Sequence, residues 1–212
     1  MKIRVLLVDD HAMMRDGLKV LLEAAGISVV GEAGDGRAAL QRAIELKPDV
    51  VVMDITMPDM NGVEAARLMR EKCSATRIVM LSMHSSSEHV FRAFEAGAVG
   101  YLLKEAAGAE VEAAVRAVHG GNRYVSSAIT SPGSAAQSHA ERSSPLDSLS
   151  ARERQVLQLV VEGRSSAEIA KVIFLSRKSV ETYRSRLMKK LDVSDVPALV
   201  KFAILHGITP PG

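Results

Sequence analysis

Short apolar runs alternate with amphipathic stretches over roughly the first 120 residues of the chain. Five runs are rich in aliphatic, often β-branched residues, as buried strands are, and between them apolar residues recur three and four positions apart, as on one face of a helix. This alternation predicts a parallel sheet covered by helices on both faces, in a doubly wound arrangement. The predicted strands are 3–8, 28–33, 50–53, 77–82 and 99–103, and the predicted helices are 13–25, 36–46, 61–72, 88–96 and 106–119.

The C-terminal part of the chain has helical periodicity and no strand pattern. Four shorter helices are predicted, at 151–162, 166–172, 177–191 and 196–206. The order of turn, short helix, turn and long basic helix is typical of a helix-turn-helix. Between the two parts, residues 126–148 are rich in Ser, Ala, Pro and Gly and have no apolar periodicity, which is typical of a flexible linker. The predicted organisation is therefore an α/β domain at 1–122, a linker at 123–147 and an all-α four-helix domain at 148–212.

Charge divides the chain in the same way. The formal net charge of +2 conceals 16 Lys and Arg against 19 Asp and Glu in residues 1–147, a net −3, and 11 against 6 in residues 148–212, a net +5. A small basic domain is typical of a nucleic-acid binder, so double-stranded DNA becomes a candidate partner.

Several classes of protein are disfavoured. Cys73 is the single cysteine, which leaves no internal disulfide and no cysteine metal site. No apolar stretch approaches the roughly 20 residues that cross a bilayer, and the N-terminal apolar run is too short for a signal sequence. We therefore expect a cytoplasmic protein without membrane contact.

Polar residues follow the predicted strands at their carboxyl ends, which in a parallel sheet meet at one edge. Asp9 and Asp10 follow the first strand, Asp54 the third, Ser82 ends the fourth and Lys104 follows the fifth. Crowded carboxylates repel one another unless a cation lies among them, and oxygen ligands favour Mg²⁺. Asp54 is then the candidate nucleophile towards a phosphoryl donor. His11 lies beside this pocket; we expect it to be a solvated residue of the first helical turn, and the alternative is that it tunes access to the pocket.

The first domain resembles the receiver domain of two-component signalling, a flavodoxin-like fold with a five-stranded parallel sheet. The resemblance rests on Val-Asp-Asp at 8–10, Met-Asp-Ile-Thr-Met-Pro-Asp-Met-Asn-Gly at 53–62, Leu-Ser at 81–82 and Tyr-Leu-Leu-Lys at 101–104. It implies that a sensor histidine kinase phosphorylates Asp54. It also implies a metal site made of Asp10, Asp54 and the Thr56 carbonyl, with Asp9 acting through water. Ser82 and Lys104 would hold the phosphoryl oxygens, and Tyr101 would swing inward as Ser82 moves. Glu105 stands where the family often has proline, so the isomer of the preceding peptide bond stays open.

The second domain resembles the LuxR-type domain of NarL/FixJ-family regulators, through residues 149–153, 163–170 and 175–181. The resemblance implies that the long basic helix enters the major groove. Lys178, Glu181, Thr182 and Ser185 would then face bases or nearby phosphates, and Arg177, Arg184, Lys189 and Lys190 would neutralise backbone charge. The final helix would pair two such domains through Val196, Leu199, Val200 and Ala203, although packing within one domain is the alternative. Tyr183, and Ser166 with Ala167, depart from the usual residues, which leaves the sequence specificity open.

These patterns predict a response regulator in which phosphorylation of Asp54 controls homodimerisation and DNA binding, and which is not a turnover enzyme. Two alternatives remain. One is an adaptor that acts through protein contacts. The other is an aspartate-nucleophile phosphatase, but such folds place an acid two residues after the nucleophile, where this chain has Thr56.

Overall fold

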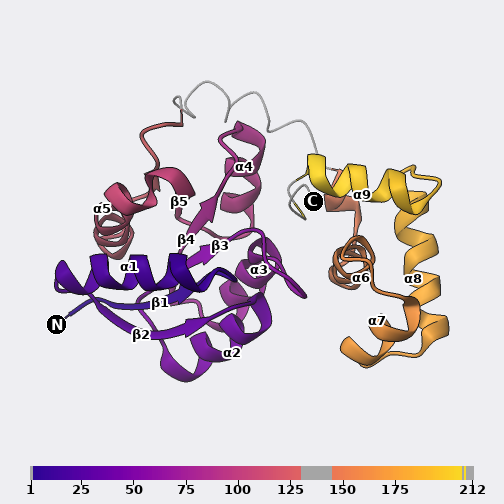
Figure 1. The fold of residues 1–212 in the computed structure, drawn as a ribbon, viewed down its shortest axis with the longest axis horizontal. Helices are drawn as coiled ribbons and strands as arrows, with labels where there is room; N and C mark the ends of the chain where they lie inside the picture. The colour runs from indigo at the N-terminus through magenta and orange to yellow at the C-terminus, as the bar shows by residue number, and fades with distance from the viewer. Residues whose placement is uncertain (1, 130–144, 207, 209–212) are drawn as a thin grey trace. The chain divides into compact units, whose positions relative to one another are not determined.

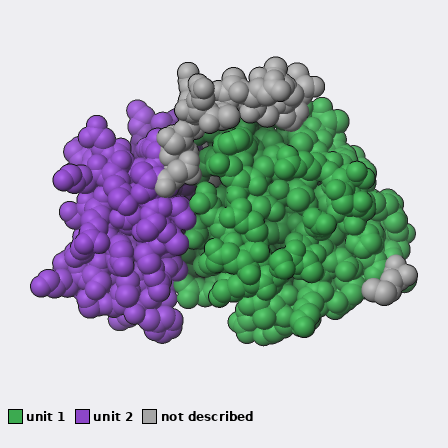
Figure 2. Space-filling view, turned by 180° about the vertical axis from the view of Figure 1, so that it is seen from behind, with its two compact units in different colours: residues 1–139 green, residues 140–212 purple. Residues whose placement is uncertain are grey.

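The computed structural model describes residues 2–129, 145–206 and 208 (Figure 1). The chain divides into two compact units, Met1–His139 and Ala140–Gly212 (Figure 2). The predicted linker spans residues 123–147. Its first residues belong to the first unit and its last residues to the second. Its central part, 130–144, lies outside the described residues, and its assignment as a linker stays a prediction.

The first unit is built on a parallel sheet. Its strands lie in the order β2-β1-β3-β4-β5-β6. They are β1 (Arg4–Val8), β2 (Ser28–Ala33), β3 (Val50–Asp54), β4 (Arg77–Ser82), β5 (Gly100–Leu103) and β6 (Tyr124–Val125). The five predicted strands are confirmed, and a two-residue sixth strand that was not predicted pairs with β5. Because β2 lies on one side of β1 and β3 on the other, strand order reverses between β1 and β3, and their carboxyl ends flank a crevice.

Helices cover both faces of this sheet, as the alternation predicted (Figure 1). They are α1 (Ala12–Ala24), α2 (Gly36–Leu46), α3 (Gly62–Lys72), α4 (Ser87–Glu95), the short 3-10 helix η1 (Lys104–Ala106) and α5 (Ala107–His119). Alternate strand residues point to opposite faces. Leu6 and Met53 pack in one core with α2, α3 and α4, whereas Leu7 and Val52 pack in a second core with α1 and α5. The peptide bond before Glu105 is trans, since the described residues contain no cis peptide.

Residues beyond α5 are attached to the edge strand β5. The Ser126 amide donates to the Tyr101 carbonyl at 2.8 Å. The Glu110 carboxylate accepts from the Ser126 hydroxyl at 2.6 Å and from the Ser127 amide at 3.2 Å. Burial raises the pKa of Glu110, but these hydrogen bonds outweigh it, so its pKa is lowered. Ile129 is buried in the same core as Tyr101. The segment from β6 to Ile129 thus belongs to the sheet unit.

The second unit contains the four predicted helices. They are α6 (Ala151–Val161), α7 (Ser166–Val172), α8 (Arg177–Lys190) and α9 (Val196–Leu205), preceded by the 3-10 helix η2 (Pro145–Ser148). Ser150 with Glu153, and Ser165 with Glu168, form capping boxes at the starts of α6 and α7. One apolar core, which includes Val156, Ile169 and Leu187, joins the helices. Across the described part of both units, no helix is long and apolar enough to cross a membrane.

Candidate functional site

The carboxyl edge of the sheet brings the predicted acidic residues together. Asp9 follows β1 and Asp54 ends β3, and both side chains are buried. Asp10 is exposed and does not cap α1, because the N-cap position of that helix is His11. The Asp9 carboxylate instead accepts a hydrogen bond from the His11 amide at 2.9 Å. These aspartates therefore lie at the crevice and are not the N-caps of the neighbouring helices, which are His11 for α1 and Asn61 for α3.

Lys104 supplies the positive charge of this pocket. Its Nζ lies 2.7 Å from Asp54 Oδ2 and 2.8 Å from Asp9 Oδ2, and its side chain is mostly buried. The short helix η1, directly after β5, carries the lysine to the edge where β1 and β3 end. An ammonium group between two buried carboxylates partly neutralises them and would attract a phosphoryl group.

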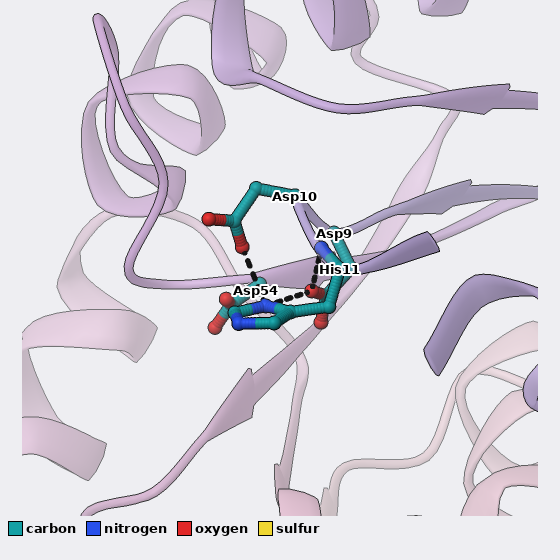
Figure 3. A group of neighbouring side chains, drawn as sticks. All are labelled: Asp9, Asp10, His11 and Asp54. Carbon is teal, nitrogen blue, oxygen red and sulfur yellow. Dashed lines mark hydrogen bonds and ion pairs between the residues drawn. The ribbon is translucent and has the colours of Figure 1, made fainter. Parts of the chain in front are cut away.

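A divalent cation fits the donor atoms of this pocket. One ligand atom each from Asp9, Asp10, His11 and Asp54 lies within 4.8 Å of the others (Figure 3). Three of these residues supply carboxylate oxygens, the donors that hard cations prefer. The fourth is His11, which the sequence placed beside the pocket and which we expected to be a solvated histidine. Its Nδ1 lies 2.8 Å from Asp10 Oδ1 and 3.0 Å from Asp9 Oδ1. Its place directly after Asp10 was the only signal for it.

Thr56 and Ser82 lie at the same edge of the sheet. The Thr56 amide donates to Asp54 Oδ1 at 3.2 Å, while the role of its carbonyl in binding metal stays a prediction. Ser82 is buried at the end of β4 and accepts from the His84 amide at 3.0 Å. Parallel register places Asp54 opposite Leu81 and Ser82 opposite Leu103. A phosphoryl group on Asp54 would therefore lie close to both Ser82 and Lys104.

Tyr101 lies inside the sheet unit. Its ring is 0% exposed, and its hydroxyl donates to the His84 carbonyl at 2.7 Å. Burial raises the pKa of this phenol to about 12, so the hydroxyl keeps its proton as a hydrogen-bond donor. The structure thus holds Tyr101 in the inward position, tied to the loop after Ser82. Its predicted movement stays a prediction.

The pocket changes the acidity of its own residues. Burial raises the pKa of Asp54 to about 6, although the hydrogen bond and charge of Lys104 oppose this shift. Burial lowers the pKa of Lys104, but Asp54 and Asp9 outweigh it, so its pKa is raised. The hydrogen bond to Asp9 and the charge of Asp10 raise the pKa of His11. At neutral pH Asp54 is therefore an ionised carboxylate held in an unfavourable environment, which destabilises the fold.

Asp54→Asn is expected to stabilise the sheet unit without divalent cations. The folded state holds the Asp54 proton more tightly than the unfolded state, so the free energy of unfolding rises as pH falls from above 6 towards the ordinary value of 3.8. The free energy of unfolding of the variant should be higher than that of the wild type by about 3 kcal/mol at neutral pH, and this difference should disappear in acid. Hydrogen exchange of the β3 and β4 amides in EDTA measures the difference, and an excess independent of pH would contradict it.

Helix α8 presents its polar residues to solvent. Arg177, Lys178, Glu181, Thr182, Ser185, Lys189 and Lys190 are exposed and Arg184 is half-buried, whereas Val180 and Leu187 are buried in the core. Arg177 Nε pairs with Glu181 Oε1 at 2.9 Å, and the Thr182 hydroxyl donates to the Lys178 carbonyl at 2.9 Å. The structure therefore places the predicted DNA-contacting residues on one helix, with their side chains largely accessible.

Lys190 has a partner within its own unit. Its Nζ lies 2.7 Å from Oε2 of Glu153, a buried carboxylate on α6, and donates to the Ser148 carbonyl at 2.9 Å. Burial raises the pKa of Glu153, but the hydrogen bonds from Lys190 and Ser150 outweigh it, so its pKa is lowered. The predicted contact of Lys190 with DNA would compete with this ion pair, which joins α8 to α6.

Lys190→Met is expected mainly to lower the stability of the four-helix unit, with a smaller effect on its affinity for DNA. Loss of the ion pair should cost about 1 kcal/mol at neutral pH, since the buried Glu153 keeps only its bonds at Ser150. Because the pKa of Glu153 is lowered, this contribution is present above the ordinary carboxyl pKa and disappears as pH falls through the lowered value. Hydrogen exchange of α6 measures it. The control, Lys189→Met, should leave stability unchanged and reduce the salt dependence of DNA binding; identical behaviour of the two variants would contradict the assignment.

The predicted dimer residues on α9 divide into two sets. Leu199 and Ala203 are 0% exposed in the core of their own unit, as the packing alternative held. Val196 and Val200 are half-buried and line a surface recess together with Pro197, Lys201, Ile204 and Leu205. Only the second set is accessible to another copy of the chain.

Two protein families match the chain, one in each unit. The response regulator receiver domain family matches residues 5–116. The family described as bacterial regulatory proteins, luxR family, matches residues 147–203.

Curated relatives match over nearly the whole length. Transcriptional regulatory protein MctR of Rhizobium johnstonii is 40% identical over 208 residues, which cover 98% of this chain and 95% of the relative. Response regulator UvrY of Escherichia coli K12 is 39% identical over 208 residues, covering 97% and 95%.

Solved structures of response regulators are also similar. A LuxR-family two-component response regulator from an Aurantimonas species shares 39% identity at a TM-score of 0.60, covering 66% of this chain and 100% of that one. The RcsB response regulator of Salmonella typhimurium shares 25% identity at a TM-score of 0.67, covering 98% of each chain. An RcsB–DNA complex shares 25% identity at a TM-score of 0.55, covering 95% of this chain and 98% of that one.

Proposed function

This chain belongs to the two-component response regulators with a LuxR-type DNA-binding domain, and from that premise we propose that a sensor histidine kinase phosphorylates it on Asp54 and thereby controls its dimerisation and DNA binding. It is a transcriptional regulator and not a turnover enzyme. The observation that carries the proposal is the buried Asp54 carboxylate with Lys104 Nζ at 2.7 Å.

The chemistry follows from the charges in the pocket. An Asp54 oxygen forms a bond to phosphorus as the bond between phosphorus and the donor's histidine nitrogen breaks. Asp10, Asp54 and the Thr56 carbonyl would hold Mg²⁺, with Asp9 acting through a water, and the bound ion would supply positive charge for the carboxylates and the phosphoryl oxygens. Lys104 and Ser82 would hold the transferred oxygens. A shift of Ser82 would change the His84 loop that Tyr101 contacts, which connects the pocket to the outer surface.

The output surface is the exposed side of α8. A helix of this kind enters the major groove with its N-terminal residues at base edges, so Lys178, Glu181, Thr182 and Ser185 would face bases or nearby phosphates. Arg177, Arg184 and Lys189 would neutralise the backbone, with a smaller part for Lys190 because of its ion pair with Glu153. Val196 and Val200 on α9 would contact a second copy, with Leu199 and Ala203 supporting them from the core. The RcsB–DNA complex supports this proposal by similarity.

A binding selection tests the proposed function. The full chain, with Mg²⁺ and a small phosphodonor, is used to select duplexes from a randomised pool, and affinities are then measured with and without the phosphodonor. We expect the phosphorylated chain to bind the selected duplex at least about tenfold more tightly, because dimerisation adds a second half-site. Failure to retain any duplex at low salt would instead support an adaptor, and turnover of free phosphomonoesters would support a phosphatase.

A further inference from the structure

Three helices of the DNA-binding unit end in the same kind of turn. The residue after each helix cap has a positive φ: 82° at Gly163 after α6, 54° at Phe174 after α7 and 54° at Asp192 after α8. The next amide then bonds back to a carbonyl five residues earlier. These bonds are Arg164 to Leu159 at 3.1 Å, Leu175 to Ala170 at 2.9 Å and Val193 to Met188 at 3.0 Å. This is the Schellman motif, in which the left-handed residue is usually glycine and sometimes asparagine.

Phe174 is the unusual residue of the three. Glycine adopts the left-handed conformation without steric cost, and aspartate tolerates it better than most residues, but a bulky aromatic residue there loses stability. The Phe174 side chain recovers little of this loss by packing, since it is 86% exposed. Its neighbours anchor the turn, because Ile173 is buried and Leu175 half-buried in the core. The stability of the folded unit therefore does not account for an aromatic ring at this position.

The position of Phe174 indicates what the ring contacts. It lies two residues before Ser176, the N-cap of α8, and four residues before Lys178. The first turn of α8 is the part of the helix that we propose to enter the major groove. Its surroundings are basic, with exposed Lys171, Arg177 and Lys178 and a net charge of +5 for residues 148–212. These cations favour a polyanion over an apolar protein surface as the neighbour of this turn.

We propose that Phe174 is a DNA-contacting residue, whose ring packs against deoxyribose or a thymine methyl group at the edge of the groove occupied by α8. Apolar contacts with the thymine methyl are an established mode of reading DNA, and the contact would cover the exposed ring. The inference rests on the proposed docking of α8. It adds an apolar contact to a surface otherwise described by charges and hydrogen bonds.

A tryptophan probe tests the contact directly. The chain contains no tryptophan, so Phe174→Trp in the full chain reports on this position alone. With a duplex selected by the wild-type chain, the emission is expected to shift to shorter wavelength and acrylamide quenching to fall. Emission and quenching that stay unchanged in the presence of bound duplex would overturn the proposal and direct attention to a protein partner.

Phe174→Asn is expected to lower the affinity for DNA without lowering the stability of the four-helix unit. Asparagine tolerates the left-handed turn, so the four-helix unit should unfold at the same or a higher temperature, while affinity for the selected duplex falls about tenfold. The slope of affinity against salt should stay the same, because no phosphate contact is removed. Asp192→Asn, at the equivalent turn after α8, is the control and should change neither quantity.

The outcomes separate this inference from the proposed function. If the wild-type chain binds duplex and Phe174→Asn binds it equally well, the role of Phe174 is wrong and the docking of α8 stands. If the wild-type chain retains no duplex, the proposed function fails together with this inference.

Discussion

Asp54→Asn is expected to take up no phosphoryl group from a small phosphodonor with Mg²⁺, whereas the wild-type chain takes up one. The reason is chemical: the amide cannot act as the nucleophile. Asp9 is also buried and lies 2.8 Å from Lys104 Nζ, but we assign it to the metal site and expect it not to accept the phosphoryl group in place of Asp54. Intact mass spectrometry under mild conditions measures the added group.

Asp59→Asn is the control for this result. Asp59 lies five residues further on in the same loop region, has a φ of 62° and is only half-buried. Asparagine tolerates that backbone conformation, so the fold should persist and one phosphoryl group should still be added. Phosphorylation of the Asp54 variant at the wild-type rate would show that another residue is the acceptor.

Gly62→Ala is expected to destabilise the sheet unit by about 3 kcal/mol, because the atoms closest to the new methyl group belong to the backbone and cannot shift without distorting the end of β3. A Cβ at Gly62 would lie 2.1 Å from the Asp54 carbonyl oxygen and 3.1 Å from Ile55 Cα, both backbone atoms. The Gly62 amide also donates to the Ile55 carbonyl at 2.8 Å, so α3 begins in direct contact with the end of β3. The clash should displace Asp54 as well, and slow its phosphorylation.

Gly17→Ala provides the matched control. Gly17 lies inside α1, and a Cβ there would meet nothing within 4 Å. Alanine should therefore stabilise this helix by about 0.5 kcal/mol. Hydrogen exchange of the β3 amides measures both variants. Equal effects of the two substitutions would contradict the close packing of α3 against Asp54.

The sequence predicted that the acidic residues and Lys104 lie together, because parallel strands bring their carboxyl ends to one edge of the sheet. Asp9, Asp54 and Lys104 are far apart in the chain, yet each follows or ends an apolar run, so the sheet geometry alone predicts that they converge. The sequence placed His11 beside the pocket but did not predict its contacts with Asp9 and Asp10, because a side chain 69% exposed at the start of a helix carries no pattern that separates it from a solvated residue.

Long-range partners were harder to predict. Lys190 belongs to a basic helix, and only the folded structure brings it to Glu153 on another helix. The apolar spacing of Leu199 and Val200 on α9 did not show which of them faces the core. The strand β6 has only two residues, too few for a periodic pattern. The unusual backbone of Phe174 left no mark in the sequence beyond an aromatic residue in a turn.

Phosphorylation of Asp54 is expected to change the assembly of the chain. Size-exclusion chromatography with light scattering, in Mg²⁺ with and without a small phosphodonor, tests it on the wild-type chain and on Asp54→Asn. We expect the mass of the wild-type chain to double only with the phosphodonor and the mass of the variant to stay the same. No change in the wild-type chain, or the same change in both, would contradict Asp54 as the control point.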